Sequence, residues 1–351
     1  MTKNDYFFLK EGRKSNLENM VTEIEVVKSP EPIVTPKYFH GSTSTRNPGS
    51  IIYNGKPLLL ITVRDSAGIS RIHVADNLNG NGKSFHIRKD PFINTDPDSL
   101  LGTEDARAVY DPISEKYLVT FTAFKEILRE KQENVTRIGL VTTRDFKTID
   151  ERRIILDEFA NNKDCVIFPN ADSKEYWVFH RPFHGGPVKD RPGIRVAKSK
   201  DLINYTDMAD LIKPREGMWD GARIGMNTPP IRVRTSDYNE ALFMLYHGAD
   251  EKKNTYRMSY VLLDPNNPLN LLERSELSLI APDRDFEIGK GNFPAEVNNV
   301  VFGNGIIPIG KNKIRLYYGG GDRYIGFADL TFKNAEVLDP VYELVKEKMG
   351  A

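Results

Sequence analysis

The chain has almost no cysteine and no net charge, and both shortages narrow its class. Its 351 residues include a single cysteine, Cys165, which excludes an intrachain disulfide and a zinc site built on several cysteines. Lysine plus arginine equals aspartate plus glutamate, at 49 each. This balance argues against a broad charged surface for a nucleic acid or a membrane, but it allows a small anion held by a few local arginines.

Long apolar runs are also missing. No segment approaches the roughly 20 apolar residues of a membrane-spanning helix, and the start, MTKNDYFFLKEGRK, has no apolar signal core. The six histidines lack metal-ligand spacing, so we expect no metal site. No dinucleotide fingerprint and no Ser-His-Asp nucleophile signature is present. We therefore expect a cytoplasmic protein without a cofactor.

The chain does contain a weak internal repeat of β-prone segments. A short strand, a polar turn, a stronger aromatic strand, a variable loop and a third strand recur about every 60 to 70 residues. The copies span residues 47–76, 104–145, 165–201, 227–264 and 298–330. Turn dipeptides such as Asn54-Gly55 and Asp111-Pro112 separate the first strand of a copy from the second.

Five such units cannot each bury an apolar face alone, but they can when they are arranged radially. The repeat therefore predicts an all-β protein, a five-bladed β-propeller that forms one domain over residues 1–351. The alternative is two stacked β-sandwich domains. We expect residues 1–40 to form an N-terminal extension with a short helix over 17–27. Residues 333–351 are expected to form a C-terminal helix, because PVYELVKEKMG has a proline start, helical apolar spacing and a glycine stop.

Polar residues recur in register within the repeat, at positions where a core strand should be apolar. The first strands of the copies begin with Asn47, Glu104-Asp105-Arg107, Phe168-Pro169-Asn170, Asn227-Thr228 and Asn298-Asn299. The second strands end with Arg64, Phe124, His180-Arg181, His247 and Asp322. A propeller binds ligands at one end of its channel. The pattern predicts a polyol site with acids and amides, beside an anion held by arginine and histidine.

Other polar or glycine-rich segments are explained by solvent exposure or by local backbone geometry. A single arginine or histidine at a strand end is more often solvated, and DRDFE at 283–287 is expected to be a solvated loop. KEILREKQE at 125–133 is expected to be an exposed insertion, able to form a rim over Glu104 and Asp105. GGG at 319–321 is interpreted as a bend that lets the backbone approach a ligand.

Gly102-Thr103-Glu104-Asp105-Ala106-Arg107 resembles the G-x-E-D-P-R signature of glycoside hydrolase family 130, with alanine in place of proline. Further motifs similar to that family follow in order over about residues 40–330: Asn47-Pro48, Arg64, Thr142-Thr143-Arg144-Asp145-Phe146, His180-Arg181-Pro182, WDGARIGMNTPP at 219–230, Tyr246-His247-Gly248 and YYGGGD at 317–322. Position 223 is arginine where the family often has lysine.

The resemblance implies a five-bladed propeller that acts on β-mannosides. Most members are inverting phosphorylases, which use inorganic phosphate to release mannose 1-phosphate reversibly, and a minority are inverting hydrolases. It implies that Asp105 is the general acid, acting through a mannose hydroxyl. It also implies that Asn47, Arg64 and Asp322 hold the mannose, and that Arg181, Arg223 and His247 bind phosphate.

We also expect two further residues, Glu104 and Tyr246, to contact the substrate or its neighbours. Glu104 is expected to bind a sugar hydroxyl or orient its neighbours, and Tyr246 to contact the sugar. The substrate is expected to be a β-mannooligosaccharide, with β-1,2 linkage favoured and β-1,4 open, and the co-substrate to be phosphate. An inverting β-mannosidase and a non-catalytic glycan-binding propeller are the alternatives. A homo-oligomer is a further possibility.

The residue types present also favour phosphorolysis over hydrolysis. A hydrolase needs a second carboxylate to activate water, whereas phosphate is already nucleophilic and needs cations to hold it. The sequence offers basic residues but no obvious second catalytic carboxylate. One conflict is that strand alternation places Asp105 and Arg107 on the same face, with Glu104 opposite. A nearby arginine lowers a carboxyl pKa, whereas a general acid needs the reverse. A bent strand start that points Arg107 elsewhere, a role for Arg107 in binding Glu104 or the ligand, or the charge of bound phosphate would each resolve this, and we favour the last.

Overall fold

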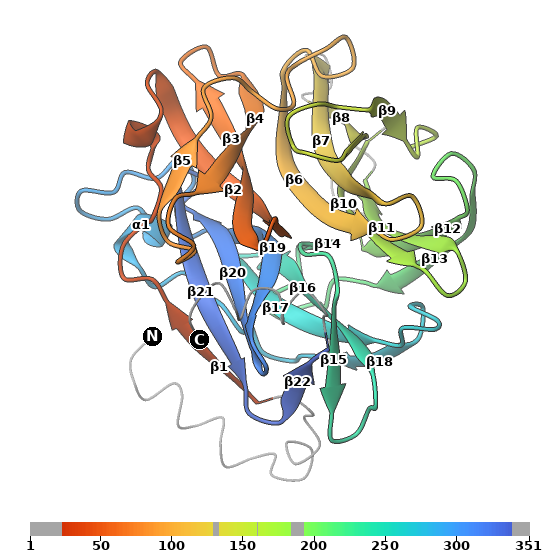
Figure 1. The fold of residues 1–351 in the computed structure, drawn as a ribbon. Coiled ribbons are helices and arrows are strands. Elements are labelled where there is room, and N and C mark those ends of the chain that lie inside the picture. Colours follow the sequence, from red (N-terminus) through yellow and green to blue (C-terminus); the bar gives the residue numbers. More distant parts are fainter. Residues whose placement is uncertain (1–22, 129–132, 160, 184–192, 339–351) are drawn as a thin grey trace.

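The computed structural model describes residues 23–128, 133–159, 161–183 and 193–338 and is almost entirely β-structure (Figure 1). Its only helices in this part of the chain are the 3-10 turn η1 (Pro36–Tyr38) and the short α1 (Asp285–Ile288). The prediction of an all-β protein is confirmed. The strands fall into five consecutive antiparallel groups, which we call units 1 to 5.

Units 1 to 3 each contain four strands. They are β2 (Ser42–Tyr53), β3 (Lys56–Asp65), β4 (Ser70–Asn77) and β5 (Phe85–Ile87) in unit 1; β6 (Gly102–Asp111), β7 (Lys116–Leu128), β8 (Glu133–Thr143) and β9 (Glu151–Ile155) in unit 2; and β10 (Asn162–Asn170), β11 (Glu175–Pro182), β12 (Ile194–Ser199) and β13 (Tyr205–Ile212) in unit 3. A single parallel bridge, between Ser70 and Gly102, joins units 1 and 2 into one sheet.

Units 4 and 5 differ in how their sheets begin and end. Unit 4 contains β14 (Arg223–Met226), β15 (Ile231–Thr235), β16 (Ala241–Ala249), β17 (Tyr256–Leu263) and β18 (Leu271–Arg274). Both β14 and β15 pair with β16, because Pro229 and Pro230 lack the N–H groups that would continue one strand. Unit 5 contains β19 (Val301–Gly310), β20 (Lys313–Gly320) and β21 (Tyr324–Phe332).

The two ends of the described chain are strands rather than the expected helices. β1 (Ile24–Lys28) pairs antiparallel with β21 and is the fourth strand of unit 5. The predicted helix over 17–27 is therefore wrong for its described part, because the β-branched stretch IEVV alternates between half-buried and exposed positions. β22 (Ala335–Val337) pairs with β15, which also contradicts a helix from residue 333. The rest of the predicted C-terminal helix lies outside the described residues.

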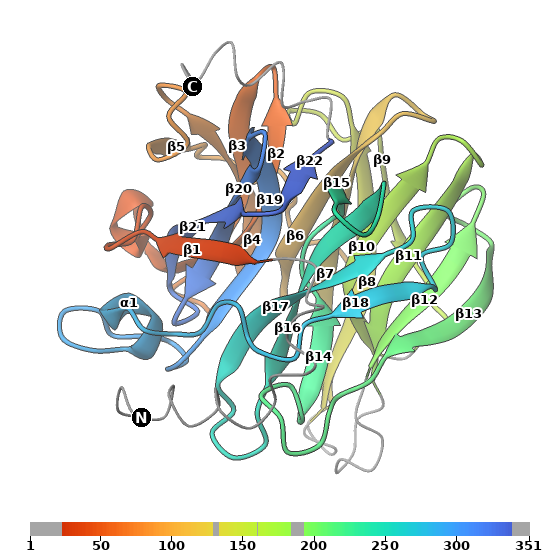
Figure 2. The same ribbon diagram turned by 90° about the horizontal axis from the view of Figure 1, so that it is seen from below.

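The expected three-strand repeat misses a fourth strand in each unit. Two of these strands, β5 and β18, are only three and four residues long, which is too short for a period-two pattern to be visible. Figure 2, seen from below, shows β1 and β18 at the outer edges of their sheets.

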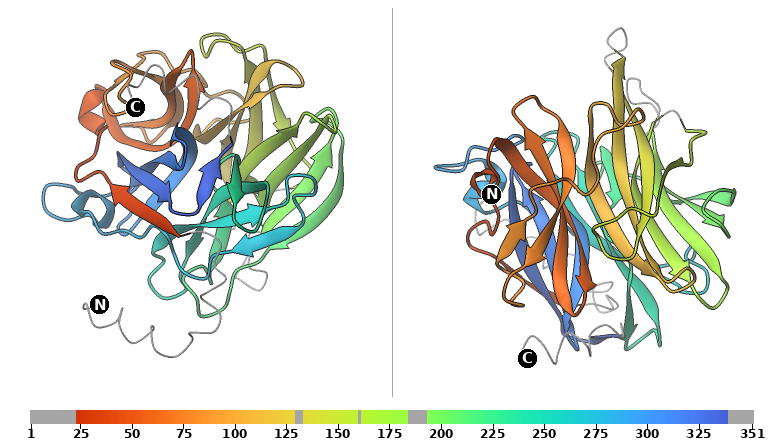
Figure 3. Two further views of the ribbon diagram at one scale, coloured as in Figure 1. Left: turned by 60° about the horizontal axis from the view of Figure 1, so that its bottom comes forward. Right: turned by 45° about the horizontal axis from the view of Figure 1, so that its top comes forward.

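The apolar core is divided into five clusters, and each lies between two units. One cluster joins units 1 and 2, the next units 2 and 3, and further clusters join units 3 and 4 and units 4 and 5. The fifth, which includes Leu59, Ile61 and Tyr317, joins unit 5 back to unit 1. Figure 3 shows the units following one another around the molecule in sequence order.

The first strands of the units lie together near the middle of the molecule (Figure 1). Asn304 Nδ2 of β19 donates a hydrogen bond to the Asn47 carbonyl of β2 at 3.1 Å. Asn227 Nδ2 of unit 4 donates to the Gly303 carbonyl at 2.7 Å. Polar residues at the starts of these strands are thereby brought close together.

Two segments, the one expected as an exposed insertion and the one expected as a solvated loop, contain regular secondary structure. The stretch 125–133 continues the β7–β8 hairpin rather than forming a separate loop, up to residues 129–132, which are not described. DRDFE overlaps α1, where Phe286 and Glu287 are buried, so the expectation of a solvated loop is wrong there. GGG at 319–321 permits close packing inside the protein, because a side chain at Gly319 would overlap Asn47, and one at Gly320 would overlap Phe286.

Candidate active site

A polar cavity of about 240 Å³ lies where the first strands meet. It is lined by Arg46, Asn47, Glu104, Asp105, Lys163, Asp164, Arg181, His247, Asn254, Tyr256, Val297, Val300, Phe302 and Asp322. Six of the predicted site residues are in this lining: Asn47, Glu104, Asp105, Arg181, His247 and Asp322. Residues far apart in sequence thus form one site, contributed mainly by strand starts and strand ends.

Three first strands present their polar residues through the same backbone device. Strands β2, β6 and β10 each contain a bulge, at Asn47, Asp105 and Asp164, where the register of pairing shifts. These residues have positive φ angles of 48°, 58° and 53°. Asparagine and aspartate tolerate this left-handed conformation better than most side chains. The bulge breaks the alternation of the strand and re-aims its side chains.

The bulge corrects the expectation that Glu104 and Asp105 lie on opposite faces, since both line the cavity. Asp105 is buried and accepts a hydrogen bond on Oδ1 from Asn47 Nδ2 at 2.9 Å. Burial and then the negative charge of Glu104 raise the pKa of Asp105 to about 7, against the opposing charge of Arg107. A carboxyl group with this pKa is partly protonated at neutral pH, as a general acid must be.

Arg107 does not bind the Asp105 carboxylate. Its Nη1 donates to the Asp105 backbone carbonyl at 2.8 Å, and its Nε to the Asn227 carbonyl at 2.9 Å. Its Nη2 donates to Asp164 Oδ1 at 3.2 Å and to the Met226 carbonyl at 3.1 Å. The buried Arg107 side chain donates to partners in units 3 and 4 and, among the described residues, pairs with neither Glu104 nor the Asp105 carboxylate, which agrees with a bent strand start. An effect of bound phosphate on the pKa of Asp105 stays a prediction.

On one side of the cavity, carboxylates and arginines alternate. Arg46 Nη2 donates to Glu104 Oε2 at 3.1 Å, and Arg46 Nη1 to Glu296 Oε2 at 3.1 Å. Arg64 pairs with the other oxygen of Glu296 and is absent from the lining. Asp322 lines this side, and burial raises its pKa while Arg46 opposes the rise. The lining arginine is therefore Arg46 rather than the predicted Arg64.

On the other side, a buried carboxylate is held among cations. Asp164 Oδ2 lies 2.8 Å from Arg181 Nε and 3.7 Å from His247 Nε2. Although burial opposes it, the charges of Arg181 and Arg107 hold the pKa of Asp164 well below its usual range. Lys163 lines the same side, with no carboxylate of the described residues in ion-pair contact with it. This side presents positive charge suited to an anion.

His247 is buried, and its hydrogen bonds define its tautomer. Asn227 Nδ2 donates to the Gly303 carbonyl, so the Asn227 Oδ1 atom is the acceptor for His247 Nδ1 at 2.5 Å. The proton of a neutral ring is therefore on Nδ1, and Nε2 carries the lone pair. Burial, supported by the charge of Arg181, lowers the pKa of His247 well below its usual value. The histidine is thus a neutral acceptor rather than the cation that the sequence suggests.

Two other predicted residues lie outside the lining. Arg223 donates to Asn254 Oδ1 and lies over the ring of Tyr256, so it supports two lining residues from behind. Tyr246 is completely buried, and its hydroxyl donates to Asp220 Oδ2 at 2.9 Å. Because it is packed in the core between units 3 and 4, Tyr246 has no surface on the cavity.

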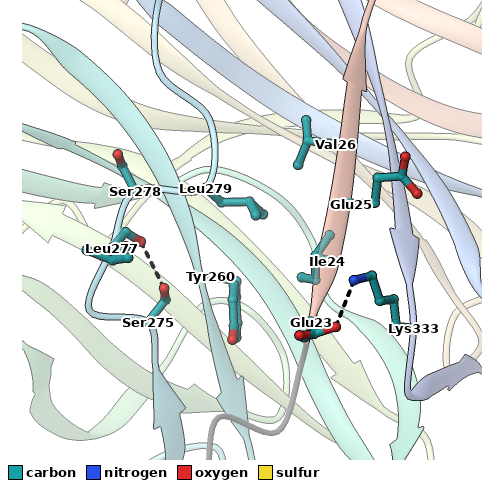
Figure 4. A pocket seen from close by; sticks show the side chains of 10 residues that line it. All are labelled: Glu23, Ile24, Glu25, Val26, Tyr260, Ser275, Leu277, Ser278, Leu279 and Lys333. Carbon is teal, nitrogen blue, oxygen red and sulfur yellow. Dashed lines mark hydrogen bonds and ion pairs between the residues drawn. The ribbon is translucent and has the colours of Figure 1, made fainter. Parts of the chain in front are cut away.

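A second, larger hollow of about 770 Å³ lies between β1 and the chain before residue 280 (Figure 4). Its lining is mainly apolar, with Ile24, Val26 and Leu279, and its charged pair is Glu23 with Lys333. It contains none of the predicted site residues. In the described part of the chain, no three His, Cys, Asp or Glu side chains are grouped to hold a metal ion. No helix there is long and apolar enough to cross a membrane.

Comparison with known proteins identifies the family. A family model described as β-1,4-mannooligosaccharide phosphorylase matches residues 11–343. The chain is 32% identical over 267 residues to a 1,2-β-oligomannan phosphorylase of Thermoanaerobacter sp., covering 76% of this chain and 80% of the relative. It is 32% identical over 274 residues to a β-1,2-mannobiose phosphorylase of Listeria innocua, covering 77% of this chain and 68% of that one.

A solved structure has the same fold. The β-1,2-mannobiose phosphorylase from Listeria innocua, in complex with β-1,2-mannobiose, superposes with a TM-score of 0.72 at 24% identity, over 93% of this chain and 99% of that chain. Together with the family model, these matches show that the protein is an enzyme. The chain belongs to glycoside hydrolase family 130, and the resemblance drawn from its motifs is confirmed.

Proposed function

We propose that the enzyme catalyses the inverting phosphorolysis of β-mannosides, releasing the terminal mannosyl unit of a β-mannooligosaccharide as α-mannose 1-phosphate. The observation that carries the proposal is one cavity in which a buried carboxyl group, Asp105, has its pKa raised to about 7 beside an anion site with Arg181 and Lys163. The linkage is proposed to be β-1,2, because the curated relatives described above are named for β-1,2-mannosides.

The proposal assigns the two sides of the cavity to the two substrates. Asp105 is the general acid, and Asn47, Glu104, Arg46 and Asp322 hold the mannose. Arg181, His247 and Lys163 bind phosphate. Arg223 acts indirectly through Asn254, and Arg64 through Glu296. Phosphate attacks the anomeric carbon from the side opposite the leaving oxygen, which inverts the configuration.

We further propose that the five units form a five-bladed propeller with this cavity at one end of its channel. The support is the set of five apolar clusters, each between two units, with the fifth joining unit 5 to unit 1. β1 would then act as a clasp, since an N-terminal strand completes the sheet formed by the C-terminal unit. A cytoplasmic location and a homo-oligomer stay predictions.

Hydrolysis is the alternative reaction, and it would need a carboxylate in the cavity that can act as a base toward water. Glu104, Asp164 and Asp322 also line it, so further carboxylates are present that a hydrolase could use as a base. Asp164 is the one on the anion side, but its lowered pKa and its two arginine partners make it a weak base for water. The same environment suits an anionic nucleophile, which favours phosphate.

The reaction run in reverse tests the proposal and its linkage. Mannose 1-phosphate is supplied with a panel of acceptors that includes mannose and N-acetylglucosamine, and the product is analysed by NMR. We expect phosphate release and a β-1,2-linked mannoside, and loss of both in Asp105→Asn. Absence of transfer to any acceptor would contradict phosphorolysis, and a β-1,4 product would contradict only the linkage.

A further inference from the structure

The anion side of the cavity offers hydrogen-bond acceptors as well as donors. Among the described residues, none accepts a hydrogen bond from the Nη atoms of Arg181, and these donors are available to a ligand. Yet Asp164 Oδ2 accepts no hydrogen bond either, although its side chain is only 1% exposed. Arg181 Nε is close to that oxygen, but its N–H makes no hydrogen bond with it. A buried acceptor without a donor is costly unless a ligand supplies one.

His247 adds a second acceptor beside the first. Because Asn227 fixes the proton of the neutral ring on Nδ1, Nε2 offers a lone pair, 3.7 Å from Asp164 Oδ2. The lowered pKa of His247 is consistent with a ring that stays neutral at physiological pH. Nε2 has no hydrogen-bond partner among the described residues.

The backbone holds the two acceptors together. Gly225 lies against both, and a side chain at this position would overlap Asp164 Oδ2 and His247 Cε1. The other carboxylate oxygen of Asp164 is fixed by Arg107 Nη2 at 3.2 Å. The acceptor pair is therefore a fixed part of the site and cannot turn away from a bound anion without breaking buried contacts.

We propose that Asp164 and His247 make this a site for an anion that carries a proton, so that it takes hydrogen phosphate and rejects sulfate. The inference rests on the proposed phosphate site and deepens it by giving these two residues a role in specificity. A P–OH group donates to Asp164 Oδ2 or His247 Nε2, while the charged oxygens accept from Arg181 and Lys163. Sulfate has the same shape but no proton at neutral pH, so its oxygens would face the acceptors directly.

The wild-type enzyme provides the first test. Phosphorolysis of β-1,2-mannobiose is followed at pH 7 with sulfate and arsenate as competitors of phosphate. Arsenate, which is protonated like phosphate, should compete at a concentration close to the phosphate KM. Sulfate should require a concentration at least about 100-fold higher, the ratio expected when a charged hydrogen bond is replaced by a repulsion. Sulfate that competes as well as arsenate would overturn the inference.

The variant Asp164→Asn provides the second test, because an amide can donate to sulfate. We expect phosphate binding to weaken and sulfate binding to strengthen, which brings their ratio to within about tenfold. Asp329→Asn is the matched control, since it removes another arginine-paired carboxylate, on β21, and should leave the ratio unchanged. An unchanged ratio in a folded Asp164→Asn enzyme would contradict the role of Asp164. If the variant does not fold, the wild-type comparison decides.

Failure of this inference is distinguishable from failure of the proposed function. If mannose 1-phosphate forms but sulfate competes equally, only the selection of a protonated anion is wrong. If no mannose 1-phosphate forms, and calorimetry detects no phosphate binding to the resting enzyme, both the proposed function and this inference are wrong.

Discussion

The chemistry of this site depends on how a few charges act on Asp105. Burial and the neighbouring Glu104 raise its pKa, whereas Arg107 lowers it. Glu104 is itself paired with Arg46, so an acid with its own cation is placed beside an acid without one. The resulting pKa of about 7 means that the proton needed by the leaving group is available below that pH and is lost above it.

Glu104→Gln should therefore move the alkaline limb of the pH profile of kcat/KM to lower pH. Removing the charge of Glu104 takes away a cause that raises the pKa of Asp105, so the acid loses its proton earlier as pH increases. We expect a shift of up to about one pH unit. Glu151→Gln, which removes an exposed carboxylate paired with Arg153, is the control and should leave the profile unchanged. A shift to higher pH would contradict this electrostatic assignment.

At the scale of elements, the bulges in β2, β6 and β10 limit which site residues can be predicted from the sequence. Asp105 and His247 can be predicted because they recur in register at strand ends. Strand alternation fails for Glu104, because a bulge is a local irregularity that period-two reasoning does not detect. Arg64 and Tyr246 occupy plausible positions, but pairing with Glu296 and packing in the core keep them out of the cavity.

Lys163 and Asp164 line the cavity and could have been predicted from a pair of residues that recurs in the sequence. Arg46-Asn47, Glu104-Asp105 and Lys163-Asp164 are equivalent pairs, each a charged residue followed by an asparagine or aspartate at the bulge. The repeat pattern places the start of the third copy at Cys165, two residues too late to include the pair Lys163-Asp164. The lining residues Tyr256 and Phe302 had no such signal, because aromatic residues at strand starts are more often part of the core.

The attachment of β1 can be tested through one buried ion pair. Lys28 Nζ of β1 lies 2.7 Å from Glu287 Oε2 of α1, with side chains 6% and 0% exposed. Lys28→Met should lower the free energy of unfolding by about 3 to 5 kcal/mol, because it leaves a buried carboxylate without its cation. Chemical denaturation measures the change. Lys333→Met removes an exposed pair with Glu23 and should have no measurable effect. Equal stability of the two variants would show that β1 is not held in this way.

At the scale of the molecule, the units are connected through their first strands as well as their apolar clusters. The single side chain of Arg107 contacts Asp164 of unit 3 and the Met226 and Asn227 carbonyls of unit 4. The repeat in the sequence predicts the number of units, but these cross-connections depend on residues that no repeat copy shares. We therefore expect the described fold to unfold as one cooperative body rather than unit by unit.

Arg107→Met should lower the stability of the whole fold by about 3 kcal/mol or more, because it leaves a buried carboxylate and several carbonyls without their donor. Unfolding is followed by circular dichroism and by tryptophan fluorescence, which reports on Trp177 and Trp219 in the middle of the chain. The two probes should show coincident transitions in the wild type and in Arg107→Met. Arg153→Met, at a half-exposed arginine, is the control and should match the wild type. Separate transitions by the two probes would contradict a single cooperative body.

The dependence of mannoside cleavage on phosphate tests the proposed phosphorolysis most directly. Purified enzyme is incubated with β-1,2-mannobiose with and without inorganic phosphate, and the sugar products are identified by NMR. We predict α-mannose 1-phosphate in the presence of phosphate and no cleavage in its absence. Release of free mannose at the same rate without phosphate would contradict phosphorolysis and would identify water as the nucleophile.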